Sequence, residues 1–267
     1  MLFCSFVSSG CDDATSVGRR ASTGALRLAV TTSTQDSGII DALVPIFENE
    51  HGVRVDVIAL GTGKALKLGE TGDVDVVFVH SRTDEDAFMA AGHGIRREDV
   101  MYNHFELLGP ASDPAGVFGT DIVEGLRRIS SGGHTFISRG DDSGTHKREL
   151  ALWQLAGGHA PWDGYLETGQ GMGSSLIIAD QKQGYILSDR GTYLRFKQKI
   201  DLVALARSSE GLRNPYGIIV VNPQTNPTPH SEMANTFVDF IISAQVQRLI
   251  DDFRIDGERL FYPLRLP

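Results

Sequence analysis

Apolar and polar positions follow two different periods along the first third of the chain. Short runs rich in Val, Ile and Leu at residues 26–30, 53–59 and 74–79 predict strands. The segments between them, residues 37–50 and 62–68, carry apolar residues at helical spacing and predict helices. This β-α-β-α-β order predicts a parallel sheet covered by helices on both faces, and therefore an α/β fold.

The pattern beyond residue 80 predicts further elements of both kinds. We expect helices at residues 84–92, 122–129, 147–155, 176–183 and 231–252, a helical turn with a solvated face at 192–199, and strands at 101–108, 135–137, 185–188, 200–205 and 216–222. The strand at 101–108 leads out of the first group of strands, and those at 200–205 and 216–222 return to it. We therefore predict two lobes, the first made of residues 26–107 plus 203–267 and the second of residues 108–202.

Two predicted strand-to-helix turns carry most of the candidate chemistry. The first reads Phe136-Ile-Ser-Arg-Gly-Asp-Asp-Ser-Gly-Thr-His-Lys-Arg148 and contains Arg139, Ser143, Gly144 and Thr145. The first N–H groups of a helix have no partner within the helix, and together with the helix dipole they attract anions. Hydroxyl groups and the planar fork of an arginine add donors for the oxygens of an oxyanion. This turn therefore predicts an anion site.

The second turn has four hydroxyl residues in a row, Thr31-Thr-Ser-Thr34, which is more than one helix cap needs. A third and a fourth helix start follow, with Thr62 and Gly63 in one and Met172 and Gly173 in the other. In an open α/β sheet, ligands bind beyond the carboxyl ends of the strands, where these turns lie. His80 also follows a predicted strand, and we rank it below the hydroxyl residues as a candidate for ligand binding.

The chain resembles a known family in several ordered stretches. They are Thr31-Thr-Ser-Thr-Gln-Asp-Ser-Gly38, Leu60-Gly-Thr-Gly-Lys-Ala-Leu66, Ser138-Arg-Gly-Asp-Asp-Ser-Gly-Thr-His146, Gly169-Gln-Gly-Met-Gly173 and Asn214-Pro-Tyr-Gly217. The family is that of the tungstate-binding proteins of bacterial ABC importers, within the periplasmic oxyanion-binding proteins.

The resemblance implies a two-lobed periplasmic-binding-protein fold, type II-like, in which each lobe is a mainly parallel sheet flanked by helices and a hinge joins the lobes. It also implies that the chain is a binding protein and not an enzyme, and that it needs no cofactor. The implied ligand is tungstate or molybdate, which the protein delivers to an ABC permease, and we expect a monomer. The ligand-binding residues that we predict are Thr32, Ser33, Thr62, Gly63, Arg139, Ser143, Gly144, Thr145, Met172 and Gly173.

Composition narrows the function classes. A net charge of −9 argues against nucleic acid as a partner, because nucleic-acid binding needs a basic face. The eight histidines have no metal-ligand spacing, and the two cysteines lie near the N-terminus, so we expect no metal other than that of the bound oxyanion.

Two alternatives stay open from the residues. One is a binder of phosphate or another small oxyanion, in which Asp141 or Asp142 accepts the proton of the ligand. The other is a Ser-dependent transferase or hydrolase that uses Ser143 with His146, although the two residues are only three positions apart.

The first 25 residues predict a tether outside the folded lobes. The stretch Ser8-Ser-Gly-Cys11 resembles a lipoprotein cleavage box without its usual leucine, with Cys11 as the residue that would carry the lipid. We therefore expect a periplasmic or otherwise extracytoplasmic protein, anchored to the membrane if Cys11 is lipidated.

Overall fold

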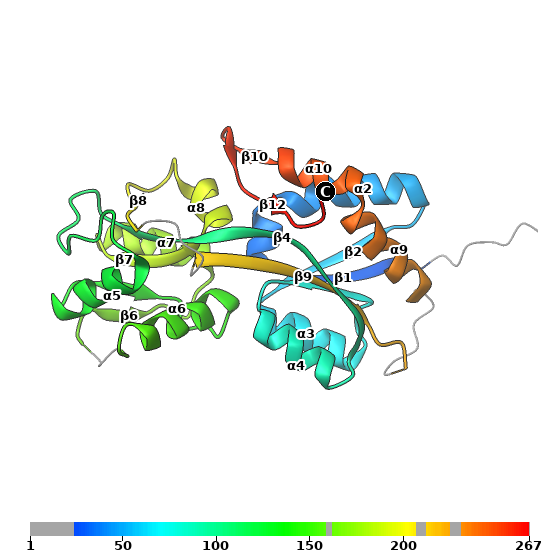
Figure 1. Cartoon of the computed structure of the whole chain (residues 1–267), viewed down its shortest axis with the longest axis horizontal. Coiled ribbons are helices and arrows are strands. Elements are labelled where there is room, and N and C mark those ends of the chain that lie inside the picture. The colour runs from blue at the N-terminus through cyan, green and yellow to red at the C-terminus, as the bar shows by residue number, and fades with distance from the viewer. Residues whose placement is uncertain (1–23, 159–161, 207–211, 225–230, 267) are drawn as a thin grey trace, which may run out of the picture.

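The structure is a computed structural model that describes residues 24–158, 162–206, 212–224 and 231–266. Two α/β halves lie side by side and are joined by long strands that run across the middle of the molecule (Figure 1). Our predictions about Cys11 and the tether fall almost wholly on residues 1–23, which lie outside the described residues.

Parallel strands form the sheet of the first half, in the order β2-β1-β3. The elements are β1 (Leu26–Thr31), α1 (Thr32–Asp36), α2 (Ile39–His51), β2 (Val55–Leu60), α3 (Thr62–Thr71), β3 (Val76–Val79) and α4 (Arg82–Ala90). All four residues of β3 are buried, as expected for a strand covered on both faces. The predicted β-α-β-α-β order is confirmed.

The second half repeats this design with parallel strands in the order β7-β5-β6. Its elements are α5 (Ile122–Ser131), β5 (Phe136–Ser138), α6 (Gly144–Leu155), β6 (Tyr165–Glu167), α7 (Met172–Gln181), β7 (Tyr185–Asp189) and α8 (Arg190–Phe196). Its own apolar core includes Phe136 and Trp153, whose rings meet edge to face at 5.1 Å. Each half therefore has a set of strand ends at which a ligand can bind.

The strands β4 (Gly94–Gly109) and β9 (Arg213–Val221) connect the halves and pair antiparallel with each other. Because β9 also pairs with β3, and β4 with β7, hydrogen bonds run without a break from one sheet into the other. β4 starts well before the strand that we predicted at residues 101–108. This pair of strands is the only place in the described ranges where one sheet passes from half to half, so it is the candidate hinge.

One predicted return strand is wrong. Of residues 200–205, only β8 (Val203–Ala204) is a strand, and it pairs with Leu108 and Gly109 at the far end of β4. It therefore stays beside the second half, and β9 is the strand that returns to the first. The exact residues that separate the lobes stay a prediction.

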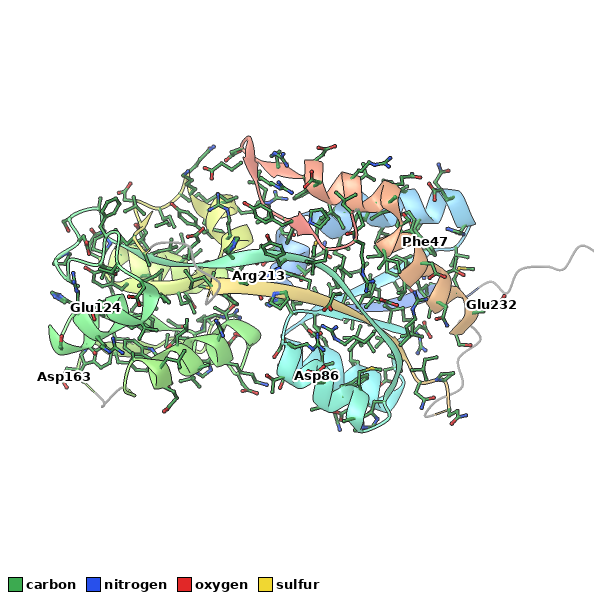
Figure 2. All side chains as sticks on the ribbon, viewed as in Figure 1. Phe47, Asp86, Glu124, Asp163, Arg213 and Glu232 are labelled. Atoms are coloured by element: carbon green, nitrogen blue, oxygen red, sulfur yellow. The ribbon has the colours of Figure 1, made fainter. Side chains whose placement is uncertain are left out.

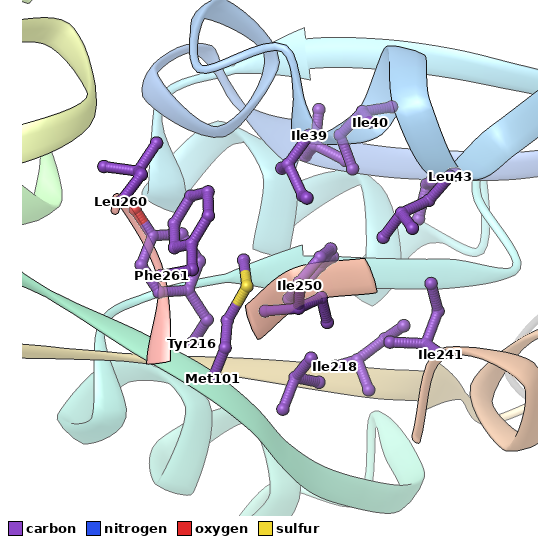
Figure 3. Packing of buried hydrophobic residues seen from close by; sticks show 14 of the residues in the cluster. Ile39, Ile40, Leu43, Met101, Tyr216, Ile218, Ile241, Ile250, Leu260 and Phe261 are labelled. Atoms are coloured by element: carbon purple, nitrogen blue, oxygen red, sulfur yellow. The ribbon is translucent and has the colours of Figure 1, made fainter. Parts of the chain in front are cut away.

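The predicted helix at residues 231–252 is two helices, α9 (Ser231–Ile242) and α10 (Ala244–Asp252). The chain breaks at Ser243, whose hydroxyl caps α10 by accepting a hydrogen bond from the backbone N–H of Val246. The short strands β10 (Arg254–Ile255), β11 (Glu258–Arg259) and β12 (Tyr262–Pro263) follow. Figure 3 shows how both helices pack into the core with α2 and β9, where Ile39, Ile218, Ile241 and Ile250 lie together.

Helix α8 covers the first part of the helical turn that we predicted at residues 192–199, and the basic residues Arg195, Lys197 and Lys199 are exposed, as the predicted solvated face requires. Its residues from Gly191 to Leu194 are buried, and Arg190 forms ion pairs with Glu106 and Glu258. The buried N-terminal side of the helix was not predicted, because it depends on contacts with residues that are distant in sequence. No helix in the described ranges is both long and apolar enough to span a membrane.

Candidate functional site

A small cavity lies where turns of the two halves meet. Its volume is ≈ 10 Å³, about the space that one water molecule needs. The lining residues come from the ends of β1, β2, β3 and β5 and are Thr31, Thr32, Ser33, Gly61, Thr62, His80, Arg139, Ser143, Gly144 and Thr145. Sequence segments about a hundred residues apart therefore enclose one space, as expected for a site between two lobes.

The first half contributes hydroxyl groups and a helix start that no side chain caps. Gly61 is the N-cap of α3 and has no side chain to accept from the first N–H groups of that helix. Thr62, the first residue of α3, is 1% exposed, and its hydroxyl has no hydrogen-bond partner among the described residues. A buried hydroxyl without a partner is costly, which indicates a group kept for a ligand.

The second half contributes the turn between β5 and α6. Gly140 and Asp142 both have a positive φ, which folds the chain back sharply before Ser143 caps α6. The hydroxyl of Thr145 is buried and, like that of Thr62, has no partner among the described residues. The turn thus presents a second unpaired donor to the same cavity.

Gly144 allows the two halves to come very close together. A Cβ atom at this position would lie 3.2 Å from the hydroxyl oxygen of Thr62 and 3.4 Å from the ring of His80. A side chain at this position would have to displace the hydroxyl of Thr62 or the ring of His80 by at least a few tenths of an ångström. The absence of a side chain at Gly144 therefore favours the close approach of α6 to Thr62 and His80.

Arg139 is buried at the end of β5, with 5% of its surface exposed. One guanidinium nitrogen, Nη2, pairs with Asp141 at 2.5 Å, so Asp141 braces the arginine within its own turn. The Nε atom is buried and has no partner among the described residues. The ion pair with Asp141 therefore engages Nη2 of the guanidinium group and leaves the Nε–H group for a ligand.

His80 lies in the wall of the cavity and is 6% exposed. Its Nε2 atom lies 3.0 Å from the hydroxyl oxygen of Ser33, and its Nδ1 atom lies 3.0 Å from the side-chain oxygen of Asn214. Burial lowers the pKa of His80 below its usual value of 6.5, while the carboxylate of Asp189 opposes this effect and Arg139 adds to it.

The structure brings together most of the residues that the sequence predicted. Thr32, Ser33, Thr62, Arg139, Ser143, Gly144 and Thr145 line the cavity. Gly63, Met172 and Gly173 are not part of its lining: Met172 is buried in the core, and Gly173 packs against Phe196. The start of α7 therefore serves packing in this conformation.

Thr31, Gly61 and His80 also line the cavity, although none of them is in the predicted set of ligand-binding residues. All three follow predicted strands directly or lie at a predicted turn, so the signal was present in the sequence. Nothing along the chain, however, shows that the histidine meets Ser33, which is 47 positions away.

A larger cavity of ≈ 820 Å³ lies against the small one and shares His80 and Gly144 with it. Charged side chains of both halves line it, and Lys147 of α6 pairs with Asp84 of α4 across the gap at 2.9 Å. Figure 2 shows Arg213, another lining residue, on β9 between the halves. This larger cavity gives the small one a polar approach from the gap between the halves.

The geometry does not support the predicted Ser–His alternative. The hydroxyl oxygen of Ser143 accepts from the backbone N–H of His146, and Nδ1 of His146 accepts from the backbone N–H of Asp142. The imidazole therefore makes no hydrogen bond to the hydroxyl that it would have to activate. Across the described residues, no group of three or more His, Cys, Asp or Glu side chains is placed to hold a metal ion.

Comparisons with known proteins agree with this architecture. The family model of the PBP superfamily domain matches residues 18–245. The tungstate-binding protein TupA of Peptoclostridium acidaminophilum is 46% identical over 245 residues, which are 90% of this chain and 86% of that protein.

Two solved structures are also similar. The tungstate-binding protein TupA of Desulfovibrio alaskensis G20 is 40% identical with a TM-score of 0.79, over 90% of this chain and 98% of that one. The tungstate ABC transporter protein of Geobacter sulfurreducens is 49% identical with a TM-score of 0.79, over 85% of this chain and 98% of that one. The predicted fold class is confirmed, and the chain belongs to the PBP superfamily, in the family of the TupA tungstate-binding proteins.

Proposed function

We propose that this chain is the solute-binding protein of an ABC importer, which holds tungstate between its halves and delivers it to a transmembrane permease. The names of its relatives support tungstate as the ligand. The observation that carries the proposal is the convergence of unpaired donors on one cavity. They are the hydroxyl groups of Thr62 and Thr145 and the Nε atom of Arg139, all of them buried.

The chemistry of these groups favours a fully deprotonated oxyanion. Hydroxyl groups and guanidinium N–H groups donate to its oxygens, whereas a ligand that keeps a proton, such as monohydrogen phosphate, also needs an acceptor, and a carboxylate is a much stronger acceptor than a hydroxyl oxygen. Neither Asp141 nor Asp142 lines the cavity, and Asp141 is engaged by Arg139 and by the backbone N–H of Ser143. Tungstate and molybdate satisfy this donor set without a carboxylate.

Binding requires the halves to move. The cavity holds about one water molecule, so an oxyanion enters only when the halves separate about β4 and β9. Contacts across the gap then form again on closure: Lys147 with Asp84, and Arg195 of α8 with the backbone oxygen of Ser37. In this proposal the closed form is the one that the permease recognises, outside the cytoplasm, and the protein acts as a monomer.

Calorimetric titration of the purified chain with tungstate, molybdate, sulfate and phosphate tests the proposal. We expect tungstate and molybdate to bind with one ligand per chain, and phosphate, which keeps a proton, to bind far more weakly. The Ser33→Ala variant should lose affinity by about 1.5–3 kcal/mol, the range for a hydrogen bond to a charged group. The surface variant Thr236→Val, whose hydroxyl donates only to the backbone oxygen of Glu232, should bind like wild type. Phosphate binding as tight as that of tungstate would refute the proposal.

A further inference from the structure

His80 occupies a position that oxyanion binding by hydrogen-bond donors alone does not explain. It follows β3, lies between Ser33 and Asn214, and its ring packs against that of Tyr216 with centroids 4.8 Å apart. A buried titratable group in the wall of a site for a dianion has a direct influence on the charge of that site.

The hydrogen bonds around His80 fix which ring nitrogen carries the proton. Asn214 donates from Nδ2 to the side-chain oxygen of Asn103 at 2.8 Å, so its own Oδ1 faces His80. A carbonyl oxygen only accepts, so Nδ1 of His80 must donate. A neutral imidazole has a single N–H, which leaves Nε2 as an acceptor for the hydroxyl of Ser33.

This arrangement directs the hydroxyl proton of Ser33 to Nε2 of His80, while the Ser33 oxygen also lies 3.2 Å from the hydroxyl oxygen of Thr31. With neutral His80, the Ser33 oxygen turns its lone pairs toward any bound anion, which is unfavourable. When the imidazole holds a second proton, Nε2 donates to the Ser33 oxygen and the hydroxyl proton is free to turn to the anion. The same proton adds a positive charge to the wall of the site.

We propose that His80 takes up a proton when the oxyanion binds. The hydroxyl of Ser33, which otherwise turns its lone pairs toward the ligand, then becomes a hydrogen-bond donor to it. This inference rests on the proposed function and adds a positioning residue to it. Proton and oxyanion then bind cooperatively, because each makes the site more favourable for the other.

The charges around His80 are compatible with a neutral ring before binding. Asp189, at the end of β7, favours the charged form, while burial and Arg139 disfavour it and hold the pKa of His80 below its usual value. The other charged groups that line the larger cavity beside His80 come from α4, α6 and the crossing strands and are Arg82, Asp84, Asp99, Lys147, Arg148 and Arg213. These charges are of mixed sign, so the dianion is the large change in the field at the ring.

Calorimetric titration with tungstate, in buffers of different ionisation enthalpy, measures the protons taken up on binding. The titration is made at pH 7 to 9, where tungstate is the simple dianion. For wild type we expect uptake that approaches one proton per tungstate at pH 7 and falls as pH rises. In the range where uptake is complete, affinity should fall by about tenfold per pH unit, the limit for one linked proton.

The variants separate His80 from other sources of protons. His80→Gln keeps an amide N–H for Ser33 but does not titrate, so it should bind tungstate without proton uptake and with a flat pH profile. The exposed His51→Gln variant should keep the uptake of wild type. If His80→Gln does not fold, ¹⁵N spectra of histidine-labelled wild type give the same answer: one histidine should become doubly protonated when tungstate is added at pH 7.

Tungstate binding to wild type without proton uptake would overturn the inference and leave the proposed function intact. A protein that binds no tungstate at any pH would overturn both. Uptake that persists in a folded His80→Gln variant would assign the proton to another group and refute the role of His80.

Discussion

The unpaired donors of the cavity should oppose closure of the empty protein and favour closure around a ligand. In the closed structure the hydroxyl groups of Thr62 and Thr145 are buried without partners. When the halves separate, water can satisfy both groups. Replacing both by Val, which has the shape of Thr without its hydroxyl, removes this opposition. We therefore predict that the Thr62→Val/Thr145→Val variant is more closed than wild type without ligand and binds tungstate more weakly.

The magnitudes follow from the number of groups involved. Burying a hydroxyl without a partner costs about 1–3 kcal/mol in proteins, so two of them oppose closure by about 2–6 kcal/mol. A hydrogen bond to a charged group is worth about 1.5–3 kcal/mol, so each lost hydroxyl should weaken binding by about 10- to 150-fold. Part of this loss is offset because each substitution also makes closure easier, so the measured loss should be smaller than the free energy of the lost hydrogen bonds alone.

Small-angle X-ray scattering and calorimetry measure the two effects. Wild type should become more compact when tungstate is added, because the halves close about β4 and β9. The double variant should be compact already and change little on addition of ligand. The control, Thr236→Val, changes a hydroxyl on α9 that donates to a backbone oxygen and should behave like wild type in both assays. A variant with the affinity of wild type, or with the larger dimensions of the free wild type, would refute the reasoning.

Three further predictions follow from single side chains. Arg139→Lys should retain some oxyanion binding but lose tungstate affinity more than molybdate affinity, because a lysine cannot reproduce the bidentate fork of an arginine. If calorimetry gives the same ratio of tungstate to molybdate affinity in variant and wild type, Arg139 only holds Asp141 in place. Burial raises the pKa of Glu149 from 4.5 to about 7, so the folded protein holds this acid in its neutral form. As pH rises from 4.5 through 7, the unfolded chain loses this proton first, and the free energy of unfolding falls by about 3 kcal/mol. Glu149→Gln should therefore be more stable than wild type toward urea at pH 8 but not at pH 4.5, and an equal difference at both would contradict the assignment. Lys147→Met breaks the ion pair with Asp84 and should lower tungstate affinity by at most about fivefold at low salt and by less at high salt, because partly exposed ion pairs contribute about 0–1 kcal/mol. A larger loss that does not depend on salt would indicate that Lys147 contacts the ligand directly.

The sequence by itself determined the local elements of this protein and most of its candidate site. Buried β-branched runs such as β3 and the hydroxyl-rich turn after β1 report on their own surroundings, because the period of a strand and the chemistry of a helix start are local properties. For the same reason Thr62, Arg139 and Thr145 could be predicted as donors before their arrangement was known.

Tertiary structure decided everything that depends on which distant segments meet. Ser243 divides one apolar pattern into two helices because the chain must turn there to pack on the core. The short strand β8 pairs with the second half, and Met172 is buried in the core rather than at the cavity. The imidazole of His80 meets Ser33 and Asn214, which are 47 and 134 positions away. Local patterns carry no information about such contacts, because they arise from how the halves and their crossing strands pack, and the free energy of that packing is spread over the whole chain.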